Sequence, residues 1–232
     1  MRAMPSLTRL PAFLRHLGLA SLLGAALAAM PAAASVPPAA SAAAAQPLTA
    51  PAAELARWIA RTGNHQSRPY VVVDKQRARV WVFDAQHRLL ASTAALLGLT
   101  VGDHEVPDIR TRNIATLAKD ARITPAGRFV TEPGVNIHGE DVVWLDYEAG
   151  LAMHRVRPGL AQAARLKRLA NEVASEQRVS LGCVVLPVAF YEGVIRPLLG
   201  RRAGVVYVLP EKEPLAAWLP RWSQATLTAR AS

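Results

Sequence analysis

The sequence is poor in cysteine, aromatic residues and acidic residues. Its single cysteine, Cys183, excludes an intramolecular disulfide and any metal site built from several cysteines. Aromatic residues make up only 6% of the 232 residues, and the basic residues are not interleaved with them, which argues against a nucleic-acid partner. With 17 acidic and 27 basic residues the formal net charge is +10, which suits a polyanion such as an acidic wall polymer or anionic lipid. The histidines and acids show no ligand spacing, so we expect neither metal nor cofactor.

The N-terminal residues follow the pattern of a secretory signal peptide. Arg2, Arg9 and Arg15 precede an uncharged apolar segment at 17–30, and the small residues at 32–34 follow it. This apolar segment is shorter than the roughly 20 residues that cross a bilayer as a helix, so we expect no stable membrane span after cleavage. An uncleaved anchor is the alternative. The sequence therefore predicts a leader at 1–34 and a periplasmic mature protein.

Composition divides the rest of the chain. Residues 35–53 are almost entirely Ala, Pro, Ser and Gln, which predicts a flexible tether because so little bulky apolar surface can be buried. We expect the remaining segments to be an N-terminal helix and lead-in at 54–69, a main domain at 70–210 and a C-terminal extension at 211–232. Trp218 and Trp222 lie four residues apart in that extension and are expected to pack on the domain.

Short β-branched and aromatic runs dominate the mature chain and predict a mostly β fold with a few helices. The expected strands are 70–73, 78–83, 89–95, 123–130, 142–145, 151–154 and 204–209, with the polar residues 74–77 forming a hairpin turn and Pro133-Gly134 breaking the pattern. Apolar residues at helical spacing predict one helix within 158–174 and a shorter one at 188–199. The long aperiodic loop 102–122 could shape a substrate cleft.

Cys183 has three interpretations in an exported protein: a buried apolar filler, an intermolecular crosslink or a reactive nucleophile. Its neighbours favour the nucleophile. The thiol follows Gly182 after an expected strand, shortly before a helix that begins near Pro187. A glycine there lets the backbone turn sharply and brings amide N–H groups near the atom that the sulfur attacks.

A cysteine nucleophile needs a base or cation beside it, because a free thiol is mostly protonated at neutral pH. Of the six histidines, His154 ends an expected apolar strand and is the leading base. His138 lies in a turn that could line a pocket, and the other four are expected in the leader or in solvated segments.

Three segments, in this order, resemble the L,D-transpeptidase family of the bacterial wall, also called the YkuD domain. They are the hairpin at 71–83, the segment Ile123-Thr124-Pro125-Ala126-Gly127-Arg128-Phe129, and Ala152-Met153-His154 followed by Ser180-Leu181-Gly182-Cys183-Val184. The resemblance covers roughly residues 70–210. It implies a β-rich catalytic domain, here with one helix inserted between the histidine and cysteine blocks.

The resemblance implies that Cys183 attacks a peptidoglycan stem tetrapeptide and forms a thioester, which an amine acceptor or water then resolves. The acceptor could be a second stem, a lysine of an outer-membrane lipoprotein, or water in an L,D-carboxypeptidase reaction. His154 would be the base, Gly182 and Cys183 would supply oxyanion-hole amides, and Ser180 would orient the histidine. The residues expected around the substrate are His138, Met153, Arg155, Leu181 and Arg178.

This chain also departs from the family pattern. Leu181 stands where many members have histidine, and Val185 stands where many have arginine. Arg155, Arg157 or Arg178 could supply the missing positive charge. A degenerate member that binds wall peptide or a partner protein without turnover is therefore the alternative function. A papain-like peptidase is disfavoured because the histidine precedes the cysteine.

Overall fold

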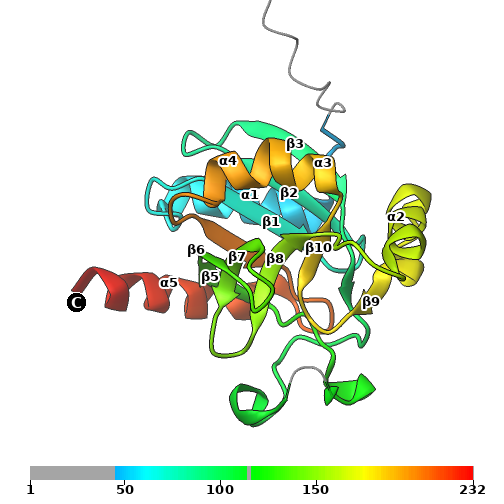
Figure 1. Cartoon of the computed structure of the whole chain (residues 1–232). Coiled ribbons are helices and arrows are strands. Elements are labelled where there is room, and N and C mark those ends of the chain that lie inside the picture. Colours follow the sequence, from blue (N-terminus) through cyan, green and yellow to red (C-terminus); the bar gives the residue numbers. More distant parts are fainter. Residues whose placement is uncertain (1–44, 114–115, 232) are drawn as a thin grey trace, which may run out of the picture. The chain divides into compact units, whose positions relative to one another are not determined.

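Two main β-sheets fold against each other in the computed structural model, which describes residues 45–113 and 116–231. The first sheet has the order β3-β2-β1-β11-β5, built from β1 (Tyr70–Asp74), β2 (Arg79–Phe83), β3 (Leu89–Ala94), β5 (Gly127–Val130) and β11 (Val205–Val208). The second has the order β10-β8-β7-β6, built from β6 (Glu132–Val135), β7 (Asp141–Asp146), β8 (Leu151–Arg155) and β10 (Val184–Leu186). Two short strands, β4 (Leu97–Gly98) and β9 (Arg178–Ser180), pair in parallel beside them. The predicted mostly β fold with a few helices is confirmed (Figure 1).

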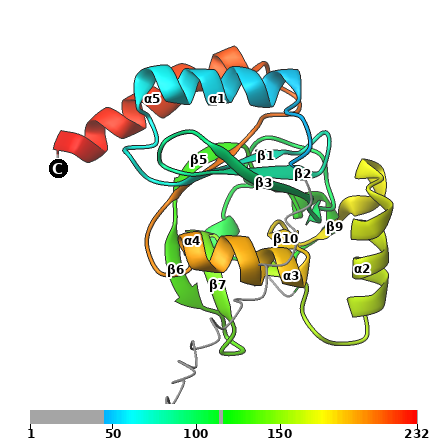
Figure 2. The ribbon, with the colours of Figure 1, turned by 90° about the horizontal axis from the view of Figure 1, so that it is seen from above.

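The main core lies between the two sheets. Strand residues that alternate along each sheet fill it, including Val71, Val73, Val80 and Val82 from the first sheet and Val143, Met153, Val184 and Leu186 from the second. The chain then closes this core with α3 (Val188–Phe190), a π-helical turn η5 (Tyr191–Ile195) and α4 (Arg196–Leu199). This is the shorter helix predicted at 188–199, and Figure 2 shows it on one side of the first sheet.

The other face of the first sheet is covered by α1 (Ala50–Thr62) and α5 (Leu215–Ala231) (Figure 2). The rings of Trp58 and Trp222 lie 6.4 Å apart, edge to face, so the C-terminal extension packs on the domain as expected. The tether prediction is wrong for residues 50–53. Thr49 caps a helix that already begins at Ala50, and the side chain of Ala52 is buried under it. The predicted signal peptide at 1–34 and the first part of the tether, 35–44, lie outside the described residues.

The predicted break at Pro133-Gly134 is wrong, because both residues belong to β6. This strand is the last of its sheet, and an edge strand tolerates proline because one side of its backbone has no ladder to maintain. The remaining helical segments are α2 (Gln162–Asn171), which is the predicted insertion between the histidine and cysteine blocks, and the short turns η1 (Ile109–Thr111), η3 (Lys119–Ala121) and η4 (Ala174–Gln177). Within the described part of the chain, no helix is long and apolar enough to cross a bilayer.

The first half of the polar turn at 74–77 is buried, although its composition suggests solvation, while Gln76 and Arg77 are exposed. Lys75 is only 1% exposed, and its Nζ donates to Asp103 Oδ1 at 2.8 Å and to the Thr124 carbonyl oxygen at 3.1 Å. Glu211 Oε1 lies 3.6 Å from the same Nζ and also pairs with Arg178. Carboxylates that arrive from distant parts of the sequence therefore make burial of this lysine tolerable.

Candidate active site

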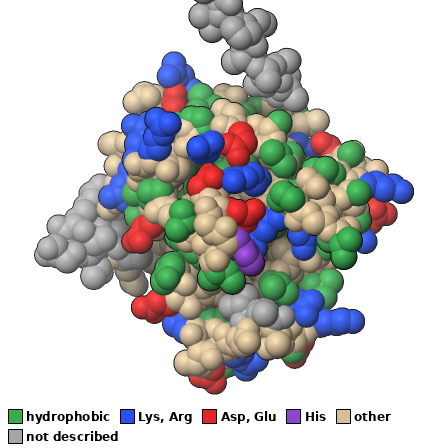
Figure 3. Space-filling view, viewed as in Figure 1, with side chains coloured by type: hydrophobic (Ala, Val, Ile, Leu, Met, Phe, Trp, Pro, Cys, Tyr) green, Lys and Arg blue, Asp and Glu red, His purple; other side chains and the backbone are tan. Residues whose placement is uncertain are grey.

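A cleft of about 520 Å³ lies on the face of the second sheet that points away from the core. Both residues singled out as nucleophile and base, Cys183 and His154, line it. The sheet also contributes Val142, Trp144, Ala152 and Val185 to the lining. Basic side chains lie around a hollow in the face that Figure 3 shows.

Strand alternation decides which side chains of β8 and β10 reach this cleft. Met153 and Val184 point into the core between the sheets, so His154 and Val185 point the other way, into the cleft. The expectation that Met153 contacts substrate is therefore wrong, because its side chain is fully buried on the opposite face.

The pairing of β8 with β10 brings the sulfur and the imidazole to the same part of the cleft. The strands run parallel, with Val185 opposite His154, so Cys183 lies two residues before the partner of His154. Neighbouring strands are about 4.8 Å apart and two residues advance about 6.6 Å, which puts the two Cα atoms roughly 8 Å apart. Two side chains on the same face can cover most of that separation. The structure places both groups in one cleft without a hydrogen bond between them, because Sγ donates to the Gly150 carbonyl and Nδ1 to the Arg155 carbonyl.

His154 is held as a neutral base. Its ring is 8% exposed, and Nδ1 lies 2.7 Å from the carbonyl oxygen of Arg155. Since a carbonyl only accepts hydrogen bonds, Nδ1 carries the hydrogen and Nε2 keeps its lone pair. Burial lowers the pKa of the ring to about 4, and the positive charge of Arg157 acts in the same direction. At neutral pH the imidazole can accept a proton.

Cys183 is held as a neutral thiol. Its Sγ lies 3.6 Å from the carbonyl oxygen of Gly150, to which the S–H donates. Burial raises the pKa of the thiol, while the backbone N–H of Ala152 and the charge of Arg157 oppose that rise. The pair is therefore a neutral thiol beside a neutral imidazole, and the thiolate has to form as the proton leaves for a base.

The turn before Cys183 requires glycine. Gly182 has φ +139°, and a Cβ there would lie 2.8 Å from the backbone oxygen of Ile123. Ser180 stabilises the same turn, because its hydroxyl donates to the Cys183 carbonyl oxygen at 2.7 Å and accepts from the Gly182 N–H at 3.1 Å. Ser180 therefore does not orient His154 as expected; the Arg155 carbonyl holds that ring. The Gly182 N–H is also already engaged, which leaves the Cys183 amide as the oxyanion donor from this pair.

Thr124 supports this turn, although the sequence gave it no role beyond the resemblance. Its side chain is fully buried, and its Oγ1 donates to the Gly182 carbonyl oxygen at 2.7 Å and accepts from the Gly98 N–H at 2.8 Å. The segment that precedes Cys183 is thereby tied to β4. In the sequence, the Thr-Pro pair at 124–125 marks this segment. It does not reveal the hydrogen-bond partners of Thr124, because they are distant in the chain.

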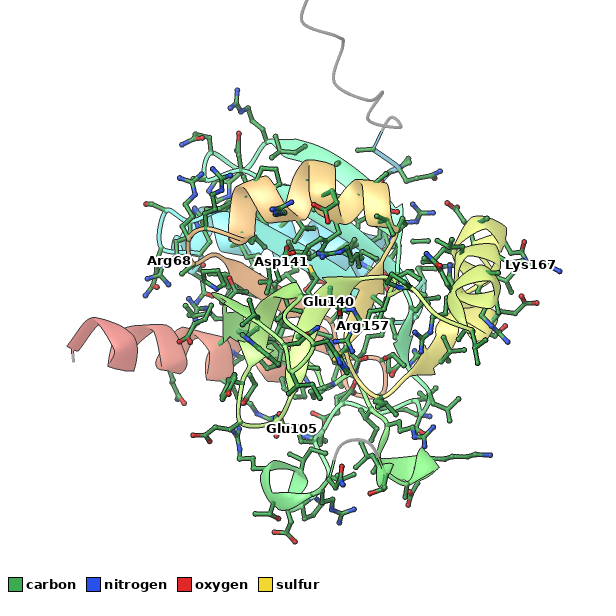
Figure 4. All side chains as sticks on the ribbon, viewed as in Figure 1. Arg68, Glu105, Glu140, Asp141, Arg157 and Lys167 are labelled. Atoms are coloured by element: carbon green, nitrogen blue, oxygen red, sulfur yellow. The ribbon has the colours of Figure 1, made fainter. Side chains whose placement is uncertain are left out.

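Three arginines line the cleft: Arg122, Arg157 and Arg165. Arg157 Nε lies 3.0 Å from Glu140 Oε2, and Figure 4 shows the two labelled side chains next to each other. Arg165 comes from α2, whose Leu169 packs with Val185 in a small apolar cluster, so this helix borders the β10 end of the cleft. The positive charge that Val185 does not supply is therefore provided by other segments.

Two arginines expected at the substrate are used elsewhere. Arg155 lies on the core-facing side of β8, where its guanidinium pairs with Asp141 at 2.9 Å and with Glu192 at 3.3 Å. Arg178 pairs with Glu211 and donates to the backbone oxygen of Lys75. Both expectations are wrong, because each cation has acidic or carbonyl partners away from the cleft.

The other two expected substrate contacts differ in outcome. Leu181 lines the cleft beside Cys183 and is 37% exposed. His138 does not line it, because the residue lies on the exposed turn between β6 and β7, with its backbone N–H on Asn136 Oδ1. The neighbours Asn136 and Ile137 line the cleft in its place.

The loop at 102–122 also reaches the site. Its last residue, Arg122, lines the cleft, and Glu105, Ile109 and Leu117 border a second, smaller pocket that shares Cys183. The loop was predicted to shape a cleft, and it borders both spaces around the sulfur. Among residues 45–113 and 116–231, histidine, cysteine and acidic side chains form no group of three that could hold a metal ion.

Comparison with known proteins gives likeness in structure only. No family model matches the chain, and no curated protein matches it. The catalytic domain of the Enterococcus faecium L,D-transpeptidase is similar over 62% of this chain and 98% of that one, with 18% identity and a TM-score of 0.31. The helical cell shape determining protein Pgp2 of Campylobacter jejuni is similar over 68% and 55% of the two chains, with 13% identity and a TM-score of 0.39. A fused zinc-dependent amidase, peptidase and peptidoglycan-binding protein of Clostridium acetobutylicum is similar over 71% and 64%, with 15% identity and a TM-score of 0.34. This chain thus spans less than two thirds of the last two.

Proposed function

We propose that this protein is an exported cysteine acyltransferase, an L,D-transpeptidase that acts on the stem peptides of peptidoglycan. The observation that carries the proposal is the shared cleft, into which parallel strands direct both the Cys183 sulfur and the His154 ring. The leader pattern and the positive net charge of the chain support a place in the periplasm, beside an anionic wall polymer.

The chemistry begins with two neutral groups. His154 Nε2 accepts the Sγ proton while the sulfur attacks the carbonyl carbon of the third stem residue, so that an S–C bond forms and the oxygen becomes negative. The Cys183 amide N–H stabilises that oxyanion. When the C–N bond to the terminal D-alanine breaks, the imidazolium returns its proton to the leaving amine. A thioester remains.

The second half of the reaction reverses these roles. An acceptor amine, or water in a carboxypeptidase reaction, attacks the thioester and gives a proton to His154. The C–S bond then breaks, and the imidazolium returns the proton to sulfur. A neutral imidazole is required at the start of both halves, and the pKa of about 4 keeps His154 neutral, although it also makes Nε2 a weaker proton acceptor than an ordinary imidazole.

The cleft arginines are suited to a substrate that ends in a carboxylate. Arg157 follows β8 by two residues and lies in the same cleft as the reacting pair. Its guanidinium can engage the terminal carboxylate of the stem and hold the scissile bond near the sulfur. We assign to Arg157 the charge that Val185 lacks.

The experiment is intact-mass spectrometry of the purified protein with meropenem, a carbapenem that acylates the cysteine of the resembling family. We expect one adduct within minutes on the wild type, none on Cys183→Ala and none on His154→Ala over the same time. Incubation with a tetrapeptide and a second stem should then release D-alanine and give a crosslinked product.

A binding module without turnover is the second candidate function. The raised pKa of the buried Cys183 thiol favours it, because a thiol in apolar surroundings is less reactive than one paired with a cation. No carbapenem adduct, together with saturable binding of the tetrapeptide, would establish this function and overturn the enzyme.

A further inference from the structure

A second hollow opens beside the cleft, at the β6–β7 edge of the second sheet. Its volume is about 680 Å³, and its lining includes Asn136, Ile137, Trp144, Tyr147, Arg110 and Glu148. None of these residues takes part in the acyl-transfer chemistry described above. The hollow therefore needs an explanation of its own.

The apolar part of this hollow is an exposed aromatic corner. The ring of Tyr147 is 5.0 Å from that of Trp144 at 79°, so one ring stands edge-on to the other. Tyr147 is 70% exposed and Ile137 is 95% exposed. A sugar ring presents a flat face of C–H groups, which packs on aromatic and aliphatic side chains arranged in this way.

The polar side chains of this hollow are held in place by hydrogen bonds to one another. Arg110 bonds Asp146 through both terminal nitrogens, at 2.7 and 2.9 Å, and Glu148 through one of them at 3.0 Å. A guanidinium has five N–H groups, so this arrangement leaves donors at the rim, and the largely exposed Glu148 carboxylate adds acceptors. Hydroxyl and acetamido groups of a sugar need such donors and acceptors around an apolar floor.

The hollow is continuous with the cleft, since Asn136, Ile137 and Trp144 line both. The order β10-β8-β7-β6 sets the sequence of groups across the sheet. Arg165 of α2 is at the β10 end, the Cys183–His154 pair follows, and the aromatic corner lies at β7 and the turn that leads from it to β8. A ligand lying across the sheet thus meets positive charge at one end and the aromatic corner at the other.

This polarity matches a stem peptide that is still attached to its glycan strand. The leaving D-alanine carries the terminal carboxylate, and the first stem residue joins a sugar. Three residues of extended chain span at most about 10 Å. Two strand spacings, from β10 to β7, span about 10 Å. The distances agree when the carboxylate faces the arginines and the sugar faces Tyr147.

We propose that the hollow at the β6–β7 edge binds the N-acetylated sugar to which the stem peptide is attached. This inference rests on the proposed function for the orientation of the stem. It makes the aromatic corner a specificity determinant, which distinguishes glycan-linked stems from free peptide.

The test compares two donors, N-acetylmuramyl tetrapeptide and the same tetrapeptide with only an acetyl group on its N-terminus. The sugar should raise kcat/KM about tenfold or more in the wild type. In Tyr147→Ala and in the double variant Tyr147→Ala/Ile137→Ser that gain should fall toward onefold. Leu160→Ser, which removes a fully exposed leucine before α2, is the matched control and should keep the full gain.

A second measurement does not depend on turnover. In saturation-transfer NMR with the Cys183→Ala protein, protons of the muramyl sugar should receive signal, and the Tyr147→Ala change should remove it. Acylation of both donors at equal rates, with no signal on the sugar, overturns the inference and leaves the proposed function intact. Sugar signal without any acylation of the active protein supports the sugar site and overturns the acyltransferase. If the NMR signal on the sugar and the gain in kcat/KM both persist in the double variant, the sugar does not bind in this hollow.

Discussion

Two groups of basic residues in this domain have opposite settings. In the first, Lys75 and Arg178 are buried with Asp103 and Glu211, and each positive group has a carboxylate partner. This network joins the β1–β2 turn, the loop after β4, the strand β9 and the segment before α5. Each charge in this network has a partner of opposite charge within the protein.

In the second group, Arg122, Arg157 and Arg165 face the cleft. Within the described residues only Arg157 of the three has an ion-pair partner, Glu140. Positive charge held in a concave site without equal negative charge favours an anionic ligand. Pairing and burial, and not residue type, therefore distinguish charges that are engaged within the fold from charges that stay available to a ligand.

The largest effect should come from removing the buried lysine. Lys75→Met leaves the buried Asp103 without its cation and Glu211 with Arg178 alone, and we expect a loss of about 3 to 5 kcal/mol in the free energy of unfolding. Arg88→Met, which removes an exposed ion pair with Asp84, should cost less than about 1 kcal/mol. Urea unfolding of the two variants measures the contrast. Equal losses would contradict it.

The next effect is the pH dependence of stability that His154 produces. Its pKa is about 4 in the folded protein, against 6.5 for the ordinary group, so the unfolded chain binds a proton that the folded protein rejects between these values. The contribution of His154 to the free energy of unfolding should be fully present above pH 6.5. It should fall by about 3 kcal/mol as the pH drops to 4 and change little below that.

Urea unfolding at several pH values measures this loss. His154→Leu should flatten most of the slope, while His65, whose pKa burial also lowers, retains a smaller part of it. In the same range the acid limb of kcat/KM should lie near pH 4. An acid limb near 6.5 would show that His154 is not the essential base.

Removal of the Thr124 hydroxyl should have a smaller effect, which changes both the stability and the rate of acylation. Thr124→Val leaves the Gly98 N–H and the Gly182 carbonyl without their partner, which should cost about 1 to 3 kcal/mol of stability and slow acylation by carbapenem. Thr124→Ser keeps the hydroxyl and should restore the acylation rate. A serine variant as slow as the valine variant would show that the methyl group, and not the hydroxyl, positions the turn.

The smallest effect should come from replacing Arg157, one of the three arginines that line the cleft. Arg157→Gln should lower kcat/KM about tenfold for a tetrapeptide with a free terminal carboxylate, and stability should change little. The loss should disappear with a substrate whose terminal carboxylate is an amide, because that substrate has no charge to lose. Lys167→Gln on the exposed face of α2 is the matched control (Figure 4). A tenfold loss with both substrates would assign Arg157 to the fold.

The strands were predictable because alternation is a local property. The runs at 70–73, 78–83 and 151–154 could be identified as strands from neighbouring residues alone, and the structure confirms them. The same alternation correctly separates Met153 from His154 once one face is known to be buried. The sequence could not say which face that was, and so Met153 was assigned to the substrate.

The sequence by itself determined the β-rich fold, the inserted helix and the single cysteine that is the candidate nucleophile. The tertiary structure alone decided which arginine faces the cleft, why Lys75 can be buried and what Thr124 holds. The contacts involved join residues that are far apart in the chain, such as Lys75 with Asp103, 28 residues away, and Thr124 with Gly182, 58 residues away. Local patterns fix elements because they depend on neighbouring residues. Charge pairing and cleft lining depend on which distant elements the folded core brings together.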